Sequence, residues 1–261
     1  MDALNKLFMH TNTSLENAFS RMEQQVPAPQ RVEWGDDGFV FRYVEQTIEQ
    51  AIVLKLARIV TGLYSAILLH RNGFFQEQGV MQRVLDELCE DANFLLYAVI
   101  RNDVTDLHKR YLTAFFEEEF DATMPTIDAP QKRPMIKRQN IRSYLTDIDA
   151  QGLSSIGQKA NPAEIGKPSR TISKAYSGFV HAAAPHVMDM YGGLPPKFYT
   201  RGMLGTPREL EYAVDLWNYF FRAILAFTLA ARAFGDRECD EFLVGMRKEF
   251  EAASHEILGD V

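Results

Sequence analysis

Two polar side chains at a helical spacing are the first candidates for chemistry in this sequence. Ser177 and His181 are four residues apart in the segment 173–191, which we predict to form one helix with both side chains on the same side. Histidine can move protons near neutral pH. Pro185 should kink the helix, because it cannot donate to the carbonyl of His181. The pattern predicts a polar site at a helix kink.

A second polar pair, Arg83 and Glu87, lies four residues apart on the predicted helix 76–101. Arginine can hold a phosphate or a carboxylate with two parallel hydrogen bonds. If the two helices pack together, they form one catalytic group, whose members are Arg83, Glu87, Tyr176, Ser177 and His181. Such a group offers the two functions of a metal-independent ribonuclease, activation of the 2′-hydroxyl and stabilisation of the phosphorane charge.

The same residues also have a structural interpretation. Arg83 and Glu87 are spaced for an ion pair within one helix. His181 would then donate to Glu87 or to a backbone carbonyl, and the group would be a polar network in a helical core.

The motifs Arg83-x-x-x-Glu87 and Tyr176-Ser177-x-x-x-His181, each on its own helix, resemble uncharacterised bacterial helical families related to the HEPN superfamily (higher eukaryote and prokaryote nucleotide-binding). The resemblance covers the layout of about residues 40–235. It implies an all-helical fold and, as in some HEPN proteins, ribonuclease activity in a toxin or in phage defence.

HEPN nucleases also carry an arginine followed by a polar residue, with a histidine after four to six intervening residues. Arg101-Asn102 and His108 match the longest of these spacings, so Arg101 and His108 are a secondary catalytic pair. The alternative is that Arg101 caps the end of its helix and that His108 lies on the surface.

A run of bases without an acid occupies residues 131–142. Its members are Lys132, Arg133, Lys137, Arg138 and Arg142. They could bind the phosphates of RNA or an acidic partner. As the alternative, they form a solvated loop and helix face that pairs with the acids of 117–121.

Metal and cofactor motifs are missing from the sequence. It contains no P-loop, dinucleotide-binding glycine pattern, Gly-x-Ser-x-Gly elbow or His-Glu-x-x-His. His181 and His186 would diverge by about 140° around a helix. We therefore expect neither a metal nor a cofactor.

The bulk charge disfavours a protein that coats nucleic acid, since the net charge is −7. Only two cysteines occur, so we expect a reducing, cytoplasmic setting. The N-terminus lacks a signal-peptide pattern. The apolar runs 59–69 and 223–231 are too short to span a bilayer, which needs about 20 residues, so we expect no membrane segment.

The elements that must position these residues follow from apolar residues spaced three and four apart. They predict an all-α fold, one domain over 1–261 with about seven or eight helices. The predicted helices are 3–24, 39–70, 76–101, 105–120, 136–150, 173–191, 206–234 and 237–258. Residues 1–30 combine the first helix with a proline-rich linker, and 122–135 and 151–169 are long internal loops.

The helices 40–71 and 206–234 should be central, and Thr206-Pro-Arg-Glu209 should open the second of them with a capping box. Because 59–69 is apolar nearly all round, a homodimer is expected. Two functions remain open. One is a ribonuclease or defence component that acts on RNA, and the other is a non-catalytic helical module that binds a protein partner or a small anionic ligand.

Overall fold

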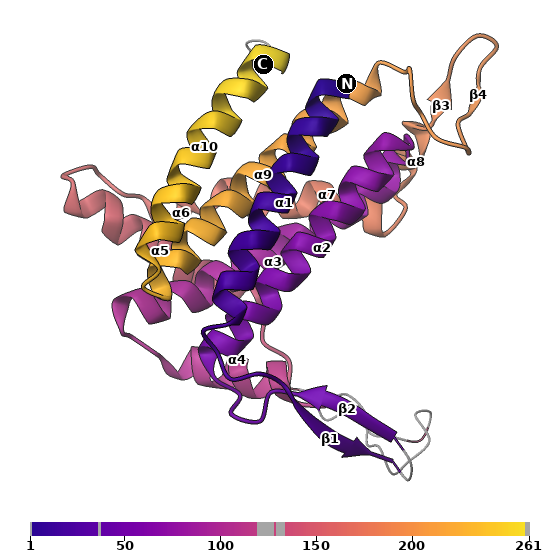
Figure 1. Ribbon diagram of the computed structural model, residues 1–261. Coiled ribbons are helices and arrows are strands. Elements are labelled where there is room, and N and C mark those ends of the chain that lie inside the picture. Colours follow the sequence, from indigo (N-terminus) through magenta and orange to yellow (C-terminus); the bar gives the residue numbers. More distant parts are fainter. Residues whose placement is uncertain (1, 36–37, 119–127, 129–133, 259–261) are drawn as a thin grey trace.

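Long helices lying side by side make up most of the structure, a computed structural model that describes residues 2–35, 38–118, 128 and 134–258 (Figure 1). The order of the elements is α1 (Asp2–Glu23), β1 (Gln30–Trp34), β2 (Gly38–Arg42), α2 (Ile48–Arg71), α3 (Phe75–Arg101), α4 (Asp106–Phe116), α5 (Arg138–Ser155), α6 (Pro162–Ile165), α7 (Lys167–Val180), α8 (Ala184–Met188), β3 (Tyr191–Gly192), β4 (Lys197–Phe198), α9 (Arg208–Ala233) and α10 (Arg237–Leu258). The predicted all-α fold class is confirmed.

The core lies between α1, α2, α3, α9 and α10. Phe8 of α1 stacks on Phe220 of α9 with ring centroids 4.8 Å apart, and Phe250 of α10 closes the same cluster. All three rings are fully buried. Burial of apolar surface on this scale is the main force that holds helices together.

α2 is the most apolar of these helices. An 18-residue window has a mean hydropathy of 1.8, enough by length and composition to cross a membrane, and half of that window is buried inside the bundle. The apolar residues predicted to recur along this helix, among them Ile52, Leu56, Ile59 and Leu63, are fully buried. They explain why α2 packs against α1, α3 and α9.

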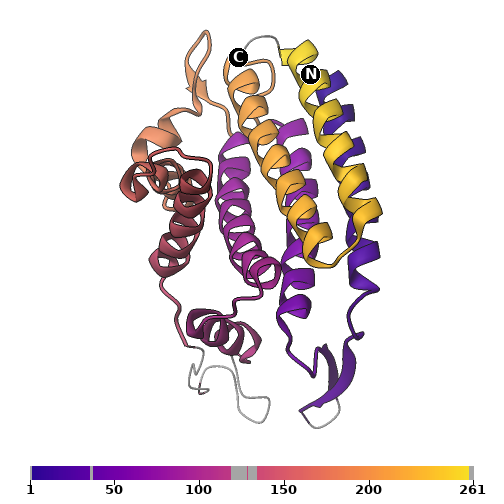
Figure 2. The same cartoon turned by 90° about the vertical axis from the view of Figure 1, so that its left-hand side faces the viewer.

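The second half of the chain adds a separate layer. Figure 2 shows α5, α6 and α7 beside α3, on the side away from α10. α7 is antiparallel to α3, since its Ser169 bonds Glu90 near one end and its Phe179 lies against Gly79 near the other. Of the 18 residues of α5, only Ile141 and Ile148 are fully buried. Apolar packing alone therefore holds α5 weakly.

Several predicted helices are confirmed almost to the residue, namely α3, α9 and α10. α1 runs without a break. The described part of the chain has eight helices of eleven or more residues, in agreement with the expected seven or eight, and two short ones, α6 and α8.

The predicted helix 39–70 is confirmed from Ile48 onward, and its first nine residues, 39–47, are wrong. Gln30–Trp34 and Gly38–Arg42 pair as the antiparallel strands β1 and β2, in which Val32 pairs with Val40. A Cβ on Gly38 would lie 2.6 Å from the carbonyl oxygen of Trp34, so the hairpin needs glycine there. The helix starts later, at Thr47, whose side chain and that of Gln50 form a capping box.

The prediction of one kinked helix over 173–191 is also wrong. α7 ends at Val180, and Ala182 takes a left-handed conformation with φ of 49°. The amides of Ala182 and Ala183 donate to the carbonyls of Phe179 and Gly178, which is the Schellman pattern of a finished helix. Pro185 then lies in the first turn of α8, where its missing N–H costs nothing.

The predicted loop 151–169 is largely helical, because α5 continues to Ser155 and α6 and the start of α7 occupy most of 162–169. Most of the other predicted loop, 122–135, lies outside the described residues. The capping box at 206–209 is wrong in detail. α9 begins at Arg208, Thr206 Oγ donates to the carbonyl of Met203, and Glu209 accepts from the amide of Gly205.

Candidate functional site

A row of buried carboxylates runs along the side of α3. Asp86 is fully buried, and Glu90 and Asp91 are 5% and 4% exposed. Buried carboxylates are stable only when bases and hydrogen-bond donors surround them. The donors come from five other elements, α2, α4, α5, α7 and α9, so this row connects the bundle to the outer layer.

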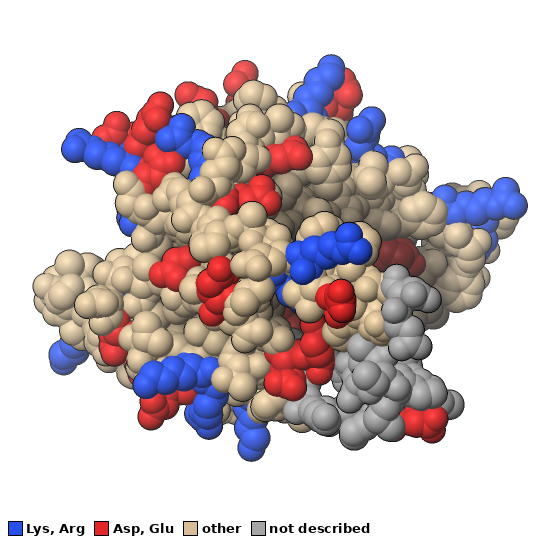
Figure 3. Space-filling view, turned by 60° about the horizontal axis from the view of Figure 1, so that its bottom comes forward, with Lys and Arg blue, Asp and Glu red and all other residues tan. Residues whose placement is uncertain are grey.

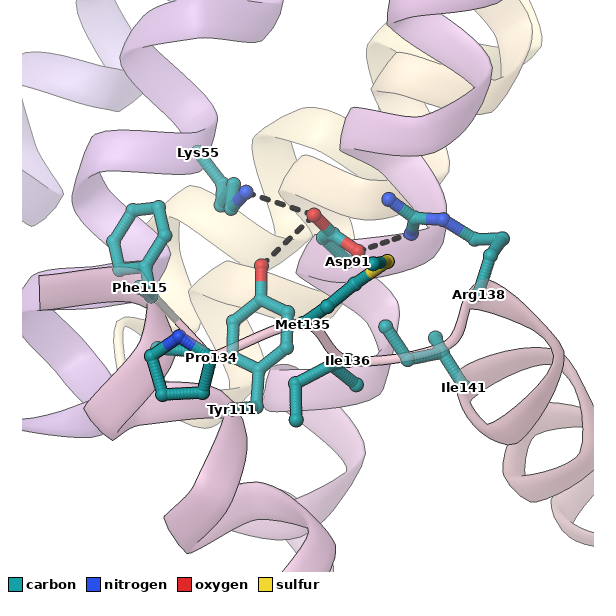
Figure 4. A pocket seen from close by; sticks show the side chains of 10 residues that line it. Lys55, Asp91, Tyr111, Phe115, Pro134, Met135, Ile136, Arg138 and Ile141 are labelled. Atoms are coloured by element: carbon teal, nitrogen blue, oxygen red, sulfur yellow. Dashed lines mark hydrogen bonds and ion pairs between the residues drawn. The ribbon is translucent and has the colours of Figure 1, made fainter. Parts of the chain in front are cut away.

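Asp91 accepts from three side chains of three different helices (Figure 4). Lys55 Nζ of α2 is 2.7 Å from one carboxylate oxygen, and the hydroxyl of Tyr111 in α4 donates to the same oxygen at 2.8 Å. Arg138 of α5 bonds the other oxygen. These groups line a cavity of about 370 Å³, whose remaining walls are mostly apolar, with Phe115, Met135 and Ile141 among them. We name this arrangement the Asp91 clamp.

Burial raises the pKa of Asp91, but the nearby charges of Lys55 and Arg138 more than offset that effect and hold the pKa below its usual value. The carboxylate is therefore ionised at neutral pH. Since all three partners bond its two oxygens, the clamp is a satisfied polar network and fits a structural role.

Asp86 and Glu90 hold the other elements. Arg222 of α9 donates to Asp86 at 2.6 Å. Glu90 accepts from Arg142 Nε of α5 at 2.8 Å and from Ser169 Oγ of α7 at 2.6 Å. Glu90 therefore joins α5 and α7, which have few direct contacts with each other, through one carboxylate.

The primary catalytic group of the sequence is divided in the structure. Arg83 forms an ion pair with Glu87 at 2.6 Å and lies 3.5 Å from Asp86. His181 is exposed at the C-terminal end of α7, beyond the level at which Phe179 meets Gly79. The two helices are adjacent, as the hypothesis required, but Arg83 lies about one helical turn further along α3 than Gly79.

Tyr176 is buried on the inner side of α7, and Ser177 next to it is half-buried. The ring of Tyr176 is buried against Tyr219, with centroids 5.7 Å apart. Burial, with Tyr219 and Asp215 nearby, raises the pKa of the Tyr176 phenol far above its ordinary value, so it stays protonated. The geometry makes Tyr176 part of the packing between α7 and α9.

The secondary pair is divided as well. His108 is fully buried, so its expected surface position is wrong. Its Nδ1 accepts from the amide of Thr105 at 3.1 Å, and its Nε2 lies 3.2 Å from the carbonyl of Phe94, on whose ring it stacks. Burial lowers the pKa of His108 and keeps it neutral. Arg101 is exposed and donates to Gln151 at 2.6 Å.

The basic segment also differs from the expected phosphate surface. Arg138 and Arg142 turn inward to the carboxylates of α3 rather than to solvent or to 117–121. Lys137 is exposed at the start of α5, and Lys132 and Arg133 lie outside the described residues. Seen from the hairpin end, acidic and basic side chains are interspersed over the surface (Figure 3).

An open cleft between α5 and α7 is the site that these arrangements create. It has a volume of about 420 Å³ and is lined by Gln139, Arg142, Ser143, Thr146, Asp147, Pro162, Ala163, Arg170, Ser173 and Lys174. The α5 residues follow a helical spacing of three and four, and so do the three from α7. Two polar helix stripes thus face each other without packing together. We name this site the α5–α7 cleft.

The cations of the cleft are only partly neutralised. Arg142 bonds Glu90 through Nε, but its buried Nη2 has no hydrogen-bond partner among the described residues and is 3.8 Å from Asp86. Arg170 donates to the backbone carbonyl of Ala163, and Lys174 is exposed. Arg142 is paired with Glu90, whereas Arg170 and Lys174 form no ion pair among the described residues, and Asp147 is the one carboxylate among the residues that line the cleft. Such a site favours an anion.

Gly166, between α6 and α7, leaves space for the cleft. A Cβ built there would lie 2.7 Å from Arg170 Nη1 and 3.0 Å from Thr146 Oγ1. Both polar groups therefore approach the backbone where any larger residue would displace them. The backbone angle of Gly166, φ −77°, suits other residues, so its role is one of space.

Arg170, Ser173 and Lys174 were not among the predicted site residues, because the start of their helix, 167–169, was predicted to be part of a loop. The signal was present in the spacing of Arg170, Ser173 and Lys174, which a helix from 167 brings to one face. No family model, curated protein or solved structure matches this chain.

Substitution of Asp91 by Asn tests the clamp. Loss of the negative charge leaves the buried charges of Lys55 and Arg138 without that carboxylate, so the free energy of unfolding at pH 7 should fall by about 3 kcal/mol. The folded pKa of Asp91 lies below the unfolded value of about 3.9, so its contribution is present above that pH and is lost as pH falls through the folded pKa. Urea unfolding should show the gap between the two proteins closing below about pH 4.

Asp106→Asn is the matched control, since its ion pair with Lys109 is exposed and its loss should leave stability nearly unchanged. If Asp91→Asn is as stable as the control at pH 7, the clamp does not hold the fold.

Proposed function

We propose that this protein binds a small anionic ligand that carries a phosphate group, in the α5–α7 cleft. The observation that supports this function is the pair of polar helix stripes, which bring Arg142, Arg170 and Lys174 to one open cavity. A phosphate offers several acceptor oxygens and up to two negative charges, and guanidinium groups bind it with paired hydrogen bonds.

The surroundings of the cleft agree with binding of a polar ligand. Its lining includes three hydroxyls, those of Ser143, Thr146 and Ser173, and one amide, that of Gln139. Pro162 and Ala163 are the apolar residues of the lining, and the carbon atoms of the longer side chains add further apolar surface. Charge and hydrogen bonds would orient a ligand there, and apolar contacts would add to its burial. The overall charge of −7 repels anions at long range, so recognition depends on this local set of cations.

The position of the three cations depends on the carboxylate row. Glu90 fixes both Arg142 on one wall and Ser169 on the other. With Nε of Arg142 on Glu90 and its buried Nη2 3.8 Å from Asp86, the carboxylate row fixes the Arg142 side chain where it lines the cleft. Arg142 is thus a rigid partner for the ligand, whereas Arg170 and Lys174 are more exposed and can adapt their conformations to it.

Titration calorimetry with inorganic pyrophosphate tests this function. Wild-type protein should bind it, and Arg170→Gln and Lys174→Gln should each weaken binding about 10-fold or more, since a hydrogen bond to a charged group is worth about 1.5–3 kcal/mol. Lys167→Gln is the matched control, because Lys167 lies on the same helix but outside the cleft lining. Absence of binding, or equal loss in all three variants, would contradict the proposal.

Gly166→Ala tests the geometry rather than the charge. The added methyl group should move the Arg170 guanidinium and weaken pyrophosphate binding several-fold, while thermal unfolding should stay close to wild type because the flexible end of Arg170 can give way. Gly152→Ala on α5 is its control, since a Cβ there meets no atom within 4 Å. Unchanged affinity in Gly166→Ala would show that Arg170 is not a ligand.

The ribonuclease interpretation stays a prediction and has its own test. If His181 and Arg83 are catalytic, His181→Ala should abolish cleavage of a single-stranded RNA without lowering the thermal midpoint, because His181 is exposed. His255→Ala in α10 serves as the control. Wild-type protein that leaves the RNA intact, or cleavage that survives in His181→Ala, would contradict a nuclease built on His181.

A further inference from the structure

Asp147 gives the α5–α7 cleft a feature that an anion site does not need. It is exposed, lies one helical turn after Ser143 on α5, and is the one carboxylate among the ten residues that line the cleft. A carboxylate accepts hydrogen bonds and donates none. Beside a bare phosphate it would only repel, so its place in the lining points to a ligand that also carries donors.

The dimensions of the cleft also exceed those of a phosphate group. Its α5 wall extends from Gln139 to Asp147, eight residues or about 12 Å of helix. A cavity of about 420 Å³ leaves most of its space empty around one phosphate. The remaining wall groups are three hydroxyls and an amide beside Pro162 and Ala163, so polar partners are available to an extension of the ligand.

The hydrogen-bonding roles of the wall groups indicate what that extension is. Thr146 donates its hydroxyl hydrogen to the carbonyl of Arg142 at 2.8 Å, so it is free to accept from the ligand. Asp147 next to it can only accept. Two neighbouring acceptors match adjacent donors on the ligand, which are the hydroxyls of a sugar or polyol.

We infer that the ligand of the α5–α7 cleft is a phosphorylated sugar or polyol, whose phosphate binds Arg142, Arg170 and Lys174 and whose hydroxyls donate to Asp147 and Thr146. This inference rests on the proposed function and adds the substrate class. It assigns Asp147 the role of selecting ligands with hydroxyls over bare phosphates.

Asp147→Asn tests the sugar part of the ligand separately from its phosphate, because it should change the affinities for two probes in opposite directions. Ribose 5-phosphate should bind about 10-fold more weakly, since the variant lacks the charged acceptor for its hydroxyls. Inorganic phosphate should bind about threefold more tightly, since the variant lacks a charge that repels it. Isothermal titration of wild type and variant with both probes measures the two changes. Ribose without phosphate should not bind either protein measurably.

Asp149→Asn is the matched control, since Asp149 is on the same helix but is not part of the cleft lining. It should change neither affinity, and the thermal midpoints of the variants show that they are folded. If ribose 5-phosphate binds wild type no more tightly than phosphate, or if Asp147→Asn changes both probes in the same direction, the sugar class is wrong and the phosphate site remains. If neither probe binds wild type, the proposed function fails, and this inference fails with it.

Discussion

Three carboxylates buried on one helix require neutralisation, and the structure is arranged around that requirement. Asp86, Glu90 and Asp91 lie inside the protein, where an unpaired charge costs several kcal/mol. The bases that neutralise them come from α2, α5 and α9. Removal of a base weakens the compensation of a buried charge, so each of these helices has a fixed place relative to α3.

The outer layer shows the consequence most clearly. α5 contributes few buried apolar residues, and its attachment depends on Arg138 at Asp91 and Arg142 at Glu90. α7 is tied to the same Glu90 through Ser169. The carboxylates therefore set the separation of α5 and α7 and with it the width of the cleft. Because Glu90 holds Arg142 of α5 and Ser169 of α7, the polar faces of the two helices remain apart and open to a ligand.

The sequence predicted the bundle well and the site poorly, for physical reasons. α3, α9 and α10 have uninterrupted apolar stripes, which tertiary packing only reinforces. The hairpin of β1 and β2 was not predicted, because Val40 in β2 and Val44 and Ile48 after it follow a helical spacing. Only the Thr47–Gln50 capping box marks the start of α2. At 173–191, Pro185 predicted a kink, whereas α7 ends five residues earlier at Val180 and is followed by Ala182 in a left-handed conformation.

The site could not be found from one segment, since its charges are paired over long distances in sequence. The sequence predicts a basic surface at Arg138 and Arg142, because it does not show that Glu90 and Asp91 lie beside them. The Arg83–Glu87 pair was available as the simpler interpretation, and the geometry is that of the simple ion pair. The polar faces of α5 and α7 form a cleft only because the buried carboxylates of α3 hold the two helices apart.

Hydrogen–deuterium exchange on the double variant Arg138→Gln/Arg142→Gln tests most directly whether charge rather than apolar packing holds the outer layer. In this variant Asp91 keeps Lys55 and Asp86 keeps Arg222, so the bundle retains its own pairs. The account predicts that amides of α5 lose protection by 10-fold or more, since each broken buried pair is worth more than 1.4 kcal/mol, while α2 and α9 keep theirs. Wild-type protection in α5 would contradict it.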